Sequence, residues 1–420
     1  MENIFPRYAI FGGSFNPVHI GHLLLADELL FVLGYDRVIL VPAFQSPLKS
    51  ASEGASPFDR MDMLAASIAG DPRLTIDDCE LQREGVSFTI DTIKDIIARY
   101  SPMEKPGLLI GDDLVSAFNE WKSPEEIVSL ADIIIARRLT GQTAAFPYPH
   151  KTLSNDIINL SSSEILEKIG RAGAWRYYVP SGARQIIEDR GLYRPGSSPA
   201  SAAFKNGNSS RTSNGRGSQP KRENEGLLEK IANIENAARA SLDFEKFIHS
   251  RNTALLSWDL CRRFGLESQK GYLAGIAHDM CKYVNEKELI RLAHEDGKSL
   301  SKLEQKKPSL LHARAAAVIL QKSFGISDKD ILDAIRYHTT GVEDMKDLAK
   351  VVYIADKIEV SRTGVDPALR EMSKKSDLDT LFSAVLNNTV SYLRSRHLDL
   401  SYGTRKLLAA MSKRNGNAKD

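Results

Sequence analysis

A glycine-rich segment near the start of the chain carries two histidines, His19 and His22, in the sequence FGGSFNPVHIGH. Gly12 and Gly13 let backbone amides approach an anion closely, and the helix predicted to follow directs its positive end toward the same place. Because the two histidines are three residues apart, they share one face of the first helical turn and can both reach a phosphate. The predicted chemistry is stabilisation of charge on a transferring phosphoryl or nucleotidyl group, without a protein nucleophile.

A second set of candidate residues is spread over the C-terminal half. Its members lie in or at the end of apolar helical segments, where a charged group needs a compensating partner. Imidazole nitrogens and carboxylate oxygens together form a mixed site for a metal ion. We therefore expect a metal centre built from four histidines and two aspartates. These are His249, His278, Asp279, His312, His338 and Asp356.

The first segment needs a sheet to position it. Short β-rich runs alternate with helical patterns, which predicts an α/β, Rossmann-like domain with a parallel sheet and helices on both faces. The glycine-rich segment then lies at the carboxyl end of the first strand, where open α/β sheets bind ligands. The predicted strands are 8–11, 37–41, 74–76, 107–110 and 132–136, and the predicted helices include 19–33 and 58–69.

The second set needs only helices. Amphipathic runs such as 225–240, 328–338 and 347–360 fill the C-terminal half, and no segment there has the pattern of a strand. This half is predicted to be all-α.

Between the halves, residues 195–222 lose all periodicity, and 17 of these 28 residues are Gly, Ser, Pro or Asn. Such a segment cannot bury enough apolar surface to offset its ordering entropy. It carries five basic residues and no acidic one, and we interpret it as a solvated tether rather than a nucleic-acid-binding segment. The expected division is a first domain over 1–194, a flexible linker over 195–224, a second domain over 225–412 and a disordered tail over 413–420.

The composition fits two soluble domains. The chain has 420 residues, 42% of them hydrophobic and 26% charged, with a net charge of +2, which excludes disorder throughout and a generic polyanion binder. Three scattered cysteines without a CxxC pair predict reduced core thiols. No apolar run approaches the ~18 residues of a membrane span, and the start lacks a secretion signal. We expect a cytoplasmic protein with no membrane and no specific nucleic-acid partner; a homo-oligomer stays open.

Further motifs follow the glycine-rich segment, and together they make residues 1–194 resemble the bacterial nicotinate-nucleotide adenylyltransferases of the HxGH nucleotidyltransferase superfamily. That family transfers AMP from ATP to nicotinate mononucleotide with Mg²⁺, releasing pyrophosphate and forming deamido-NAD. The motifs are Val41-Pro42, Pro47-Leu48-Lys49, Arg60 with Met63-Leu64, Ser87-Phe88-Thr89, Asp91-Thr92, Ile110-Gly111-Asp112-Asp113, Trp121, Arg137-Arg138, Leu160-Ser161-Ser162-Ser163 and Gly191-Leu192-Tyr193.

The resemblance implies roles residue by residue. It gives His19, His22 and Lys49 the stabilisation of the ATP phosphates and of the transition state. It assigns ATP and phosphate binding to Gly12, Gly13, Ser14, Phe15, Asp113, Ser161 and Ser162, and mononucleotide binding to Ser87, Phe88, Thr89, Trp121 and Arg138. A pyridine ring on the Trp121 indole, with its carboxylate on the backbone amides of residues 87–89, makes physical sense of the second group.

Two positions depart from that family's pattern. Leu48 stands where members commonly have a phosphate-binding histidine, and Leu166 stands where a phosphate-contacting arginine is expected. Lys168 follows two residues later. The alternatives for this half are an adenylyltransferase for nicotinamide mononucleotide or for pantetheine phosphate; a class I aminoacyl-tRNA synthetase would need a KMSKS-type loop, which we do not find.

The ordered histidines and aspartates of the second half resemble the HD phosphohydrolases, and over 226–412 their symmetrical diadenosine tetraphosphate hydrolases. The resemblance implies two divalent ions, iron or Mn²⁺. His249, His278, Asp279 and Asp356 would hold one ion, and His312 and His338 the other, with Asp279 bridging; the products would be two ADP. The alternatives are a regulatory nucleotide-sensing module and a phosphatase for another nucleotide. His150, His294 and His397 match neither pattern and are expected at the surface.

Overall fold

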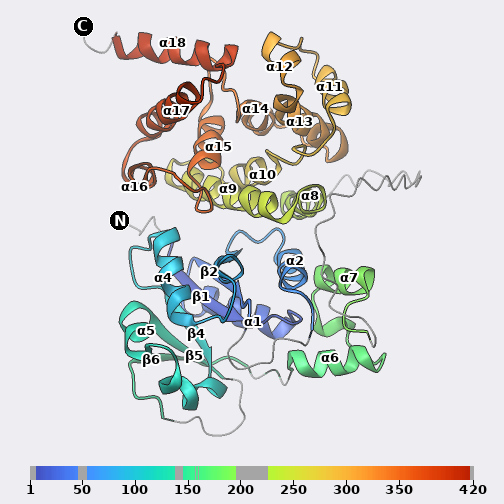
Figure 1. The fold of residues 1–420 in the computed structure, drawn as a ribbon, viewed down its shortest axis with the longest axis vertical. Coiled ribbons are helices and arrows are strands. Elements are labelled where there is room, and N and C mark those ends of the chain that lie inside the picture. Colours follow the sequence, from blue (N-terminus) through green and yellow to red (C-terminus); the bar gives the residue numbers. More distant parts are fainter. Residues whose placement is uncertain are drawn as a thin grey trace. The chain divides into compact units, whose positions relative to one another are not determined.

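The structure is a computed structural model that describes residues 6–45, 54–137, 145–156, 158, 160–194 and 226–416. The chain forms two compact units, Met1–Asn224 and Glu225–Asp420, and each is described by itself below (Figure 1).

The N-terminal unit is built on one parallel sheet of six strands in the order β3-β2-β1-β4-β5-β6. The strand order reverses between β1 and β4, so the crevice at their carboxyl ends is the place where such sheets bind ligands. The strands are β1 (Tyr8–Gly13), β2 (Arg37–Pro42), β3 (Leu74–Ile76), β4 (Gly107–Gly111), β5 (Asp132–Ala136) and β6 (His150–Leu153).

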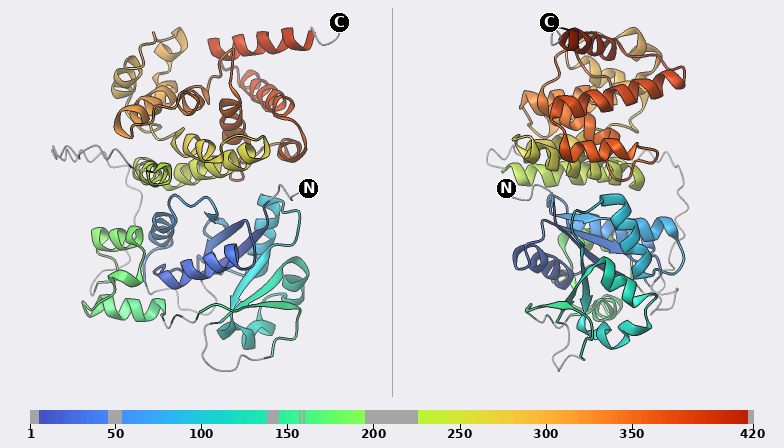
Figure 2. Two further views of the ribbon diagram at one scale, coloured as in Figure 1. Left: turned by 180° about the vertical axis from the view of Figure 1, so that it is seen from behind. Right: turned by 90° about the vertical axis from the view of Figure 1, so that its left-hand side faces the viewer.

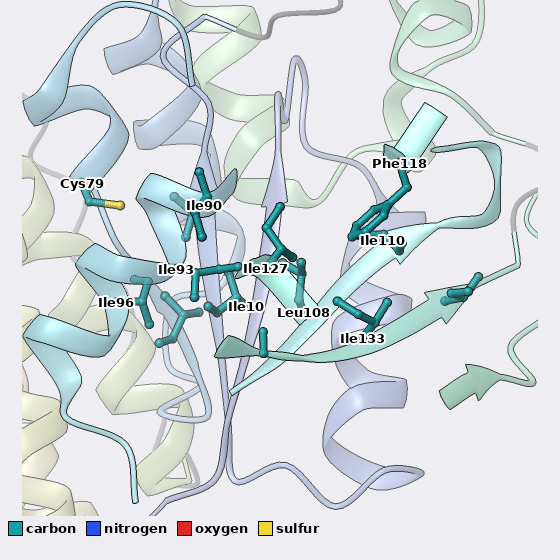
Figure 3. Close-up of a cluster of buried hydrophobic side chains, with 14 of the residues drawn as sticks. Ile10, Cys79, Ile90, Ile93, Ile96, Leu108, Ile110, Phe118, Ile127 and Ile133 are labelled. Atoms are coloured by element: carbon teal, nitrogen blue, oxygen red, sulfur yellow. The ribbon is translucent and has the colours of Figure 1, made fainter. Parts of the chain in front are cut away.

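Helices cover both faces of this sheet (Figure 2). On one face, isoleucines of α4 and α5 form a cluster with alternate residues of the strands, including Ile10, Leu108 and Ile133 (Figure 3). On the other face α1 and α2 contact β2. The helices are α1 (Ile20–Phe31), α2 (Pro57–Ser67), α3 (Cys79–Arg83), α4 (Thr89–Tyr100), η1 (Asp112–Glu120), α5 (Pro124–Leu130), α6 (Ser162–Gly170), η2 (Arg176–Tyr178) and α7 (Ser181–Arg190).

This architecture confirms the predicted α/β class. The five expected strands are present, and the sixth, β6, was not predicted because its sequence lacks the apolar run of a buried strand. Only Leu153 of its four residues is buried, since β6 lies at the edge of the sheet.

The C-terminal unit contains no strand among its described residues 226–416, which confirms the all-α prediction. Its helices are α8 (Leu227–Ser241), α9 (Phe244–Arg263), α10 (Ser268–Ala277), α11 (Glu286–His294), α12 (Lys302–Lys306), η3 (Pro308–Leu311), α13 (His312–Ser323), α14 (Lys329–Tyr337), α15 (Asp347–Ile358), α16 (Pro367–Lys375), α17 (Leu378–Ser395) and α18 (Tyr402–Gly416). Helix α18 continues to residue 416, although we expected a disordered tail from residue 413. The expected linker lies outside the described residues.

Two glycines set the spacing between α9 and α10, the helices that carry His249 and lead to His278. A Cβ atom at Gly275 would lie 2.5 Å from Cα of Ala254, and one at Gly271 would lie 2.8 Å from the Ser257 carbonyl oxygen. Because no real side chain tolerates such contacts, glycine at both positions is what lets the two backbones touch. The close approach brings the two histidines into one buried region.

The three cysteines are all buried and unpaired. Burial raises the pKa of both Cys261 and Cys281 to about 12, so these thiols stay protonated. Both are core residues, as their scattered positions predicted. Within the described part of the chain, no helix is long and apolar enough to cross a membrane.

Candidate active sites

A cavity of about 740 Å³ opens at the carboxyl ends of β1 and β4. It brings together segments that are far apart in the sequence: the end of β1, the first turn of α1, residues 87–89, η1 and the start of α6. The sequence-predicted residues that line it are Gly12, Gly13, Ser14, His19, His22, Ser87, Phe88, Thr89, Asp113, Trp121, Ser161 and Ser162. Lys49 and Arg138, the remaining predicted cations of this site, lie outside the described residues.

The two histidines stand at the N-terminus of α1. His19 is the N-cap residue in extended conformation, and its backbone amide donates to Nδ1 of His22 over 3.1 Å. Since Nδ1 of His22 accepts this bond, a neutral His22 carries its proton on Nε2, where it can be donated to a phosphate oxygen. The two rings lie 3.7 Å apart between centroids, so both imidazoles meet a ligand from the same side.

Phe15, a predicted phosphate-binding residue, does not line the cavity. Its side chain is fully buried, and its ring packs edge-on against His22 with the centroids 5.0 Å apart. The side chain therefore supports a histidine from behind rather than facing a ligand.

The loop before α4 is anchored by its own side chains. The Ser87 hydroxyl accepts a bond from the backbone amide of Phe44 over 3.0 Å, and the Ser87 amide donates to the Gln45 carbonyl over 2.9 Å. The Ser87 hydroxyl is thus engaged in holding the loop against the end of β2. What remains for a ligand is the backbone of residues 88 and 89, at the N-terminus of α4.

Glu80 is a cavity residue that sequence reasoning missed. It lines the cavity although its side chain is buried, and it accepts a hydrogen bond from the Thr92 hydroxyl. Burial raises the pKa of Glu80, an effect that hydrogen bonds to Ser87 and Thr92 only partly offset. A lone glutamate in a short helical segment has no motif to mark it, so only the fold shows its place beside the residue 87–89 loop.

Trp121 follows η1 and is half-buried. One part of the indole packs on Phe118, with ring centroids 5.0 Å apart, while the residue also lines the cavity. Phe118 is in turn packed against Phe146 and Tyr148. An aromatic face backed by a rigid aromatic cluster is a suitable platform for a planar ring.

The N-terminus of α6 forms part of the cavity wall. Ser161 caps the helix by accepting from the Glu164 amide over 3.2 Å, and the Ser162 hydroxyl donates to the Pro17 carbonyl over 3.1 Å. This second bond docks α6 directly onto the segment that precedes His19. Lys168 does not line the cavity, and its ammonium lies 5.7 Å from the centroid of the Tyr178 ring. It therefore does not replace the arginine expected at Leu166.

In the C-terminal unit, the six predicted metal residues converge in one buried cluster. His249 comes from within α9, His278 and Asp279 directly follow α10, and Asp356 comes from α15. His312 is the first residue of α13, and His338 directly follows α14. All six side chains are nearly inaccessible to solvent.

The side-chain atoms form two overlapping groups, each within 4.8 Å: His249, His278 and Asp356, and His278, Asp279 and His338. In the first, Asp356 Oδ1 is 3.1 Å from His249 Nε2 and 3.7 Å from His278 Nε2. Asp279 contacts two different histidines. Its Oδ2 is 3.7 Å from His278 Nε2, and its Oδ1 is 3.0 Å from His312 Nε2.

The other ring nitrogen of each histidine is held from outside the cluster. Nδ1 of His278 donates to the Gly275 carbonyl over 2.6 Å, and His312 and His338 bond in the same way to carbonyls three residues earlier. His249 instead donates to the Glu359 carboxylate over 3.0 Å. Since Nδ1 of His278, His312 and His338 donates to a carbonyl, Nε2 of these three histidines presents its lone pair to the centre of the cluster. Nε2 of His249 instead lies 3.1 Å from Asp356 Oδ1, to which it donates when His249 is protonated.

The electrostatic environment favours the metal-binding protonation state at His278 and at Asp356. Burial lowers the pKa of His278 to about 3, so this imidazole is neutral. Burial alone would raise the pKa of Asp356, but the Lys357 ammonium and a hydrogen bond from His249 hold it well below its usual value. Burial alone would lower the pKa of His249, but hydrogen bonds to Asp356 and Glu359 raise it. His278 and Asp356 are therefore in the protonation states that metal binding requires, whereas His249 must release its proton when it binds a metal ion.

Comparison with known proteins places both units. The cytidylyltransferase-like family matches residues 10–168, and the HD domain family matches residues 247–361. A probable nicotinate-nucleotide adenylyltransferase of Borreliella afzelii (strain PKo) is 38% identical over 187 residues, which are 44% of this chain and 96% of that protein. Its counterpart in Treponema pallidum (strain Nichols) is 35% identical over 202 residues, covering 45% and 99%.

The chain belongs to the nicotinate-nucleotide adenylyltransferase family. The match lies in the N-terminal unit, and the HD domain is fused to it in the same chain. A solved structure titled as a predicted HD superfamily hydrolase involved in NAD metabolism, from Clostridium acetobutylicum, is 28% identical and covers 43% of this chain and 96% of that one, with a TM-score of 0.41. The Plasmodium falciparum nicotinic acid mononucleotide adenylyltransferase is 19% identical over 45% of this chain and 97% of that one, with a TM-score of 0.38.

An HD domain implies divalent metal binding, and the histidine–aspartate cluster of the C-terminal unit has residues that fit such a centre. Atoms that share an ion at ~2.0–2.2 Å lie about 3–4.4 Å apart, and the distances of 3.1 and 3.7 Å around Asp356 Oδ1 fall in that range. Nε2 of His278 is fully buried and has no hydrogen-bond partner in the described part of the chain. A metal ion would explain why a buried imidazole nitrogen in a polar cluster has no hydrogen-bond partner.

The surface histidines complete the comparison with the sequence. His150, His294 and His397 are exposed, and they contribute to neither cluster among the described residues.

Proposed function

We propose that the N-terminal unit transfers AMP from ATP to nicotinate mononucleotide in NAD biosynthesis. The observation that carries this proposal is that one cavity joins a phosphate-facing end, with His19 and His22, to an aromatic end, with Trp121 and the residue 87–89 loop. Such a cavity suits a reaction in which two nucleotides meet phosphate to phosphate. Curated relatives that the chain covers almost completely carry the same activity in their names.

In the proposed reaction a phosphate oxygen of the mononucleotide attacks the α-phosphorus of ATP, and pyrophosphate leaves as that bond forms. His19 and His22 bind the phosphate oxygens on which charge develops, and the backbone amides at the starts of α1 and α6 add partial positive charge. Lys49 and Arg138 supply full charges in this proposal, and Mg²⁺ arrives with ATP. The backbone amides of Phe88 and Thr89 bind the nicotinate carboxylate, and the Trp121 indole stacks on the pyridine ring.

The test of this assignment compares Michaelis constants. Trp121→Ala should raise the KM for nicotinate mononucleotide about 10-fold or more, the size expected for a lost stacking contact, and leave the KM for ATP within about twofold. Trp121→Phe serves as the matched control and should retain most of the affinity. Equal increases for both substrates would contradict the stacking role, and a preference for nicotinamide mononucleotide would contradict the substrate.

We propose that the HD domain hydrolyses diadenosine tetraphosphate symmetrically to two ADP. The observation that supports it is the pair of overlapping histidine–aspartate groups that share His278, together with the position of Asp279, whose Oδ2 lies 3.7 Å from His278 Nε2 and whose Oδ1 lies 3.0 Å from His312 Nε2. In this proposal His249, His278, Asp279 and Asp356 would hold one divalent ion, and His312 and His338 would hold the other, with Asp279 shared by both. When bound, two such ions, iron or Mn²⁺, would polarise a phosphate oxygen and lower the pKa of a bound water.

The experiment incubates the purified, metal-loaded chain with diadenosine tetraphosphate and separates the nucleotides by chromatography. We expect ADP as the one product. Asp279→Ala should abolish metal loading and hydrolysis and leave adenylyl transfer unchanged, because that residue belongs to the other unit. Formation of AMP and ATP would contradict symmetrical cleavage. Absence of cleavage with metal bound and the transferase active would favour a regulatory nucleotide-sensing module.

A further inference from the structure

Two partly exposed cations bind the two oxygens of Asp356. The Lys357 ammonium contacts Oδ2, and the Arg362 guanidinium donates from Nη2 to Oδ1 over 2.6 Å. Their side chains are 23% and 38% exposed, whereas the Asp356 side chain is 6% exposed. Both cations therefore contact the buried histidine–aspartate cluster and also reach solvent.

Arg362 is held in place by its neighbours. Its Nε donates to the Asp356 carbonyl over 2.9 Å, and its own carbonyl accepts from Arg370 Nη2 over 2.9 Å. Arg370 also binds the carbonyls of Ile358 and Glu359, so the turn after α15 has several fixed points. A guanidinium on such a turn loses little conformational entropy when it binds a ligand.

The guanidinium still has donors available for an anion. Its Nη2 also lies 3.3 Å from Nε2 of His249, which is a predicted metal ligand. No bond from Nη1 to the described residues is seen. Arginine presents five N–H donors in a planar fork that matches phosphate oxygens. The group at the edge of the cluster is therefore chemically suited to a phosphate that also contacts the metal centre.

The balance of charges in the cluster also favours a bound anion. The carboxylates of Asp279, Asp356 and Glu359 together bring fewer negative charges than two divalent ions would bring positive ones, and Lys357 and Arg362 add to the excess. Natural sites do not keep such an excess of positive charge buried without an anion. We propose that Arg362, together with Lys357, binds the phosphate oxygens of the substrate at the HD centre and competes with the metal for Asp356.

This inference rests on the proposed phosphohydrolase function and extends it by naming the groups that recognise the phosphates. It has a consequence that a merely structural ion pair lacks. Removing Arg362 removes a competitor from Asp356 Oδ1, so metal affinity should rise while phosphate affinity falls. If the arginine only stabilised the turn, both affinities would fall together.

The experiment uses the full chain and two titrations, first with Mn²⁺ and then with inorganic pyrophosphate on the Mn²⁺-loaded protein. Arg362→Gln should bind Mn²⁺ as tightly as the wild type or a few-fold more tightly. It should bind pyrophosphate about 10- to 100-fold more weakly, the effect of losing hydrogen bonds to a charged group. Lys357→Gln should act in the same directions, and Arg362→Lys should recover part of the loss.

Two controls complete the design. Asp279→Ala measures the pyrophosphate that binds elsewhere on the chain, and Arg394→Gln removes an equal charge from an exposed position on α17. An unchanged pyrophosphate affinity in Arg362→Gln, or a joint loss of both affinities, would overturn the inference. Arg362-dependent pyrophosphate binding in a chain that does not cleave diadenosine tetraphosphate would leave the inference standing and remove only the proposed substrate.

Discussion

Glu359 differs from the other groups that hold the metal-facing histidines, because it is a carboxylate rather than a backbone carbonyl. Its Oε1 accepts from His249 Nδ1 over 3.0 Å, and the same carboxylate accepts from the amide and hydroxyl of Ser361. Backbone carbonyls cannot be changed by substitution, but Glu359 can. It is therefore the place where the role of these outer contacts is open to experiment.

We predict that Glu359→Gln weakens metal binding about 10- to 100-fold, the usual effect of removing an outer contact of a ligating histidine. The amide lacks the charge that raises the basicity of His249, and its NH₂ group opposes the Ser361 amide. Calorimetric titration with Mn²⁺ measures the effect. Glu371→Gln, at an exposed position of α16, should bind Mn²⁺ like the wild type, and an unchanged affinity in Glu359→Gln would refute the positioning role.

At the scale of elements, the last helix supports a loop that is some 60 residues earlier in the sequence. The hydroxyls of Ser401 and Thr404, at the start of α18, donate to the Thr340 carbonyl over 3.2 and 2.7 Å. A Cβ atom at Gly403 would lie 2.4 Å from the Gly341 carbonyl oxygen. Helix α18 thus packs directly against the loop that follows His338.

We predict that Gly403→Ala destabilises the C-terminal unit by about 1–3 kcal/mol, the usual cost of overpacking, and weakens metal binding through displacement of the His338 loop. Thermal unfolding and Mn²⁺ titration measure the two effects. Gly226→Ala is the matched control, since nothing lies within 4 Å of a Cβ there. Wild-type metal affinity in Gly403→Ala would show that α18 does not position His338.

At the scale of the whole molecule, the chain has two compact units, each with its own buried core. The candidate metal residues belong to the second unit alone. A ligand stabilises only the folded unit that binds it, by about 2.7 kcal/mol when its concentration is 100 times its Kd.

Differential scanning calorimetry should therefore resolve two unfolding transitions, and Mn²⁺ should raise the temperature of one of them. The shifted transition belongs to the C-terminal unit, so Asp279→Ala should remove the shift without moving the other transition. A single transition that moves as a whole with Mn²⁺ would show that the two units unfold as one.

Features that depend on the spacing of residues within one strand or one helix were predictable from the amino-acid sequence. The strand alternation placed the glycine-rich segment at the carboxyl end of β1, because parallel strands place their ends on one edge. The i, i+3 spacing placed His19 and His22 on one helical turn. Likewise, imidazoles and carboxylates inside apolar helices predicted a cluster, since such groups need partners. The edge strand β6 was missed because it has no buried run.

The class of each unit and the residue types that carry chemistry could be read from the amino-acid sequence, since both depend on local periodicity and composition. Which side chains face a ligand became visible only in the folded chain. Phe15 supports His22 from behind, Lys168 lies against Tyr178, Glu80 joins the cavity wall, and Arg362 binds Asp356. These outcomes depend on contacts between segments far apart in the chain, and no local spacing encodes the direction in which a side chain points once helices and strands have packed.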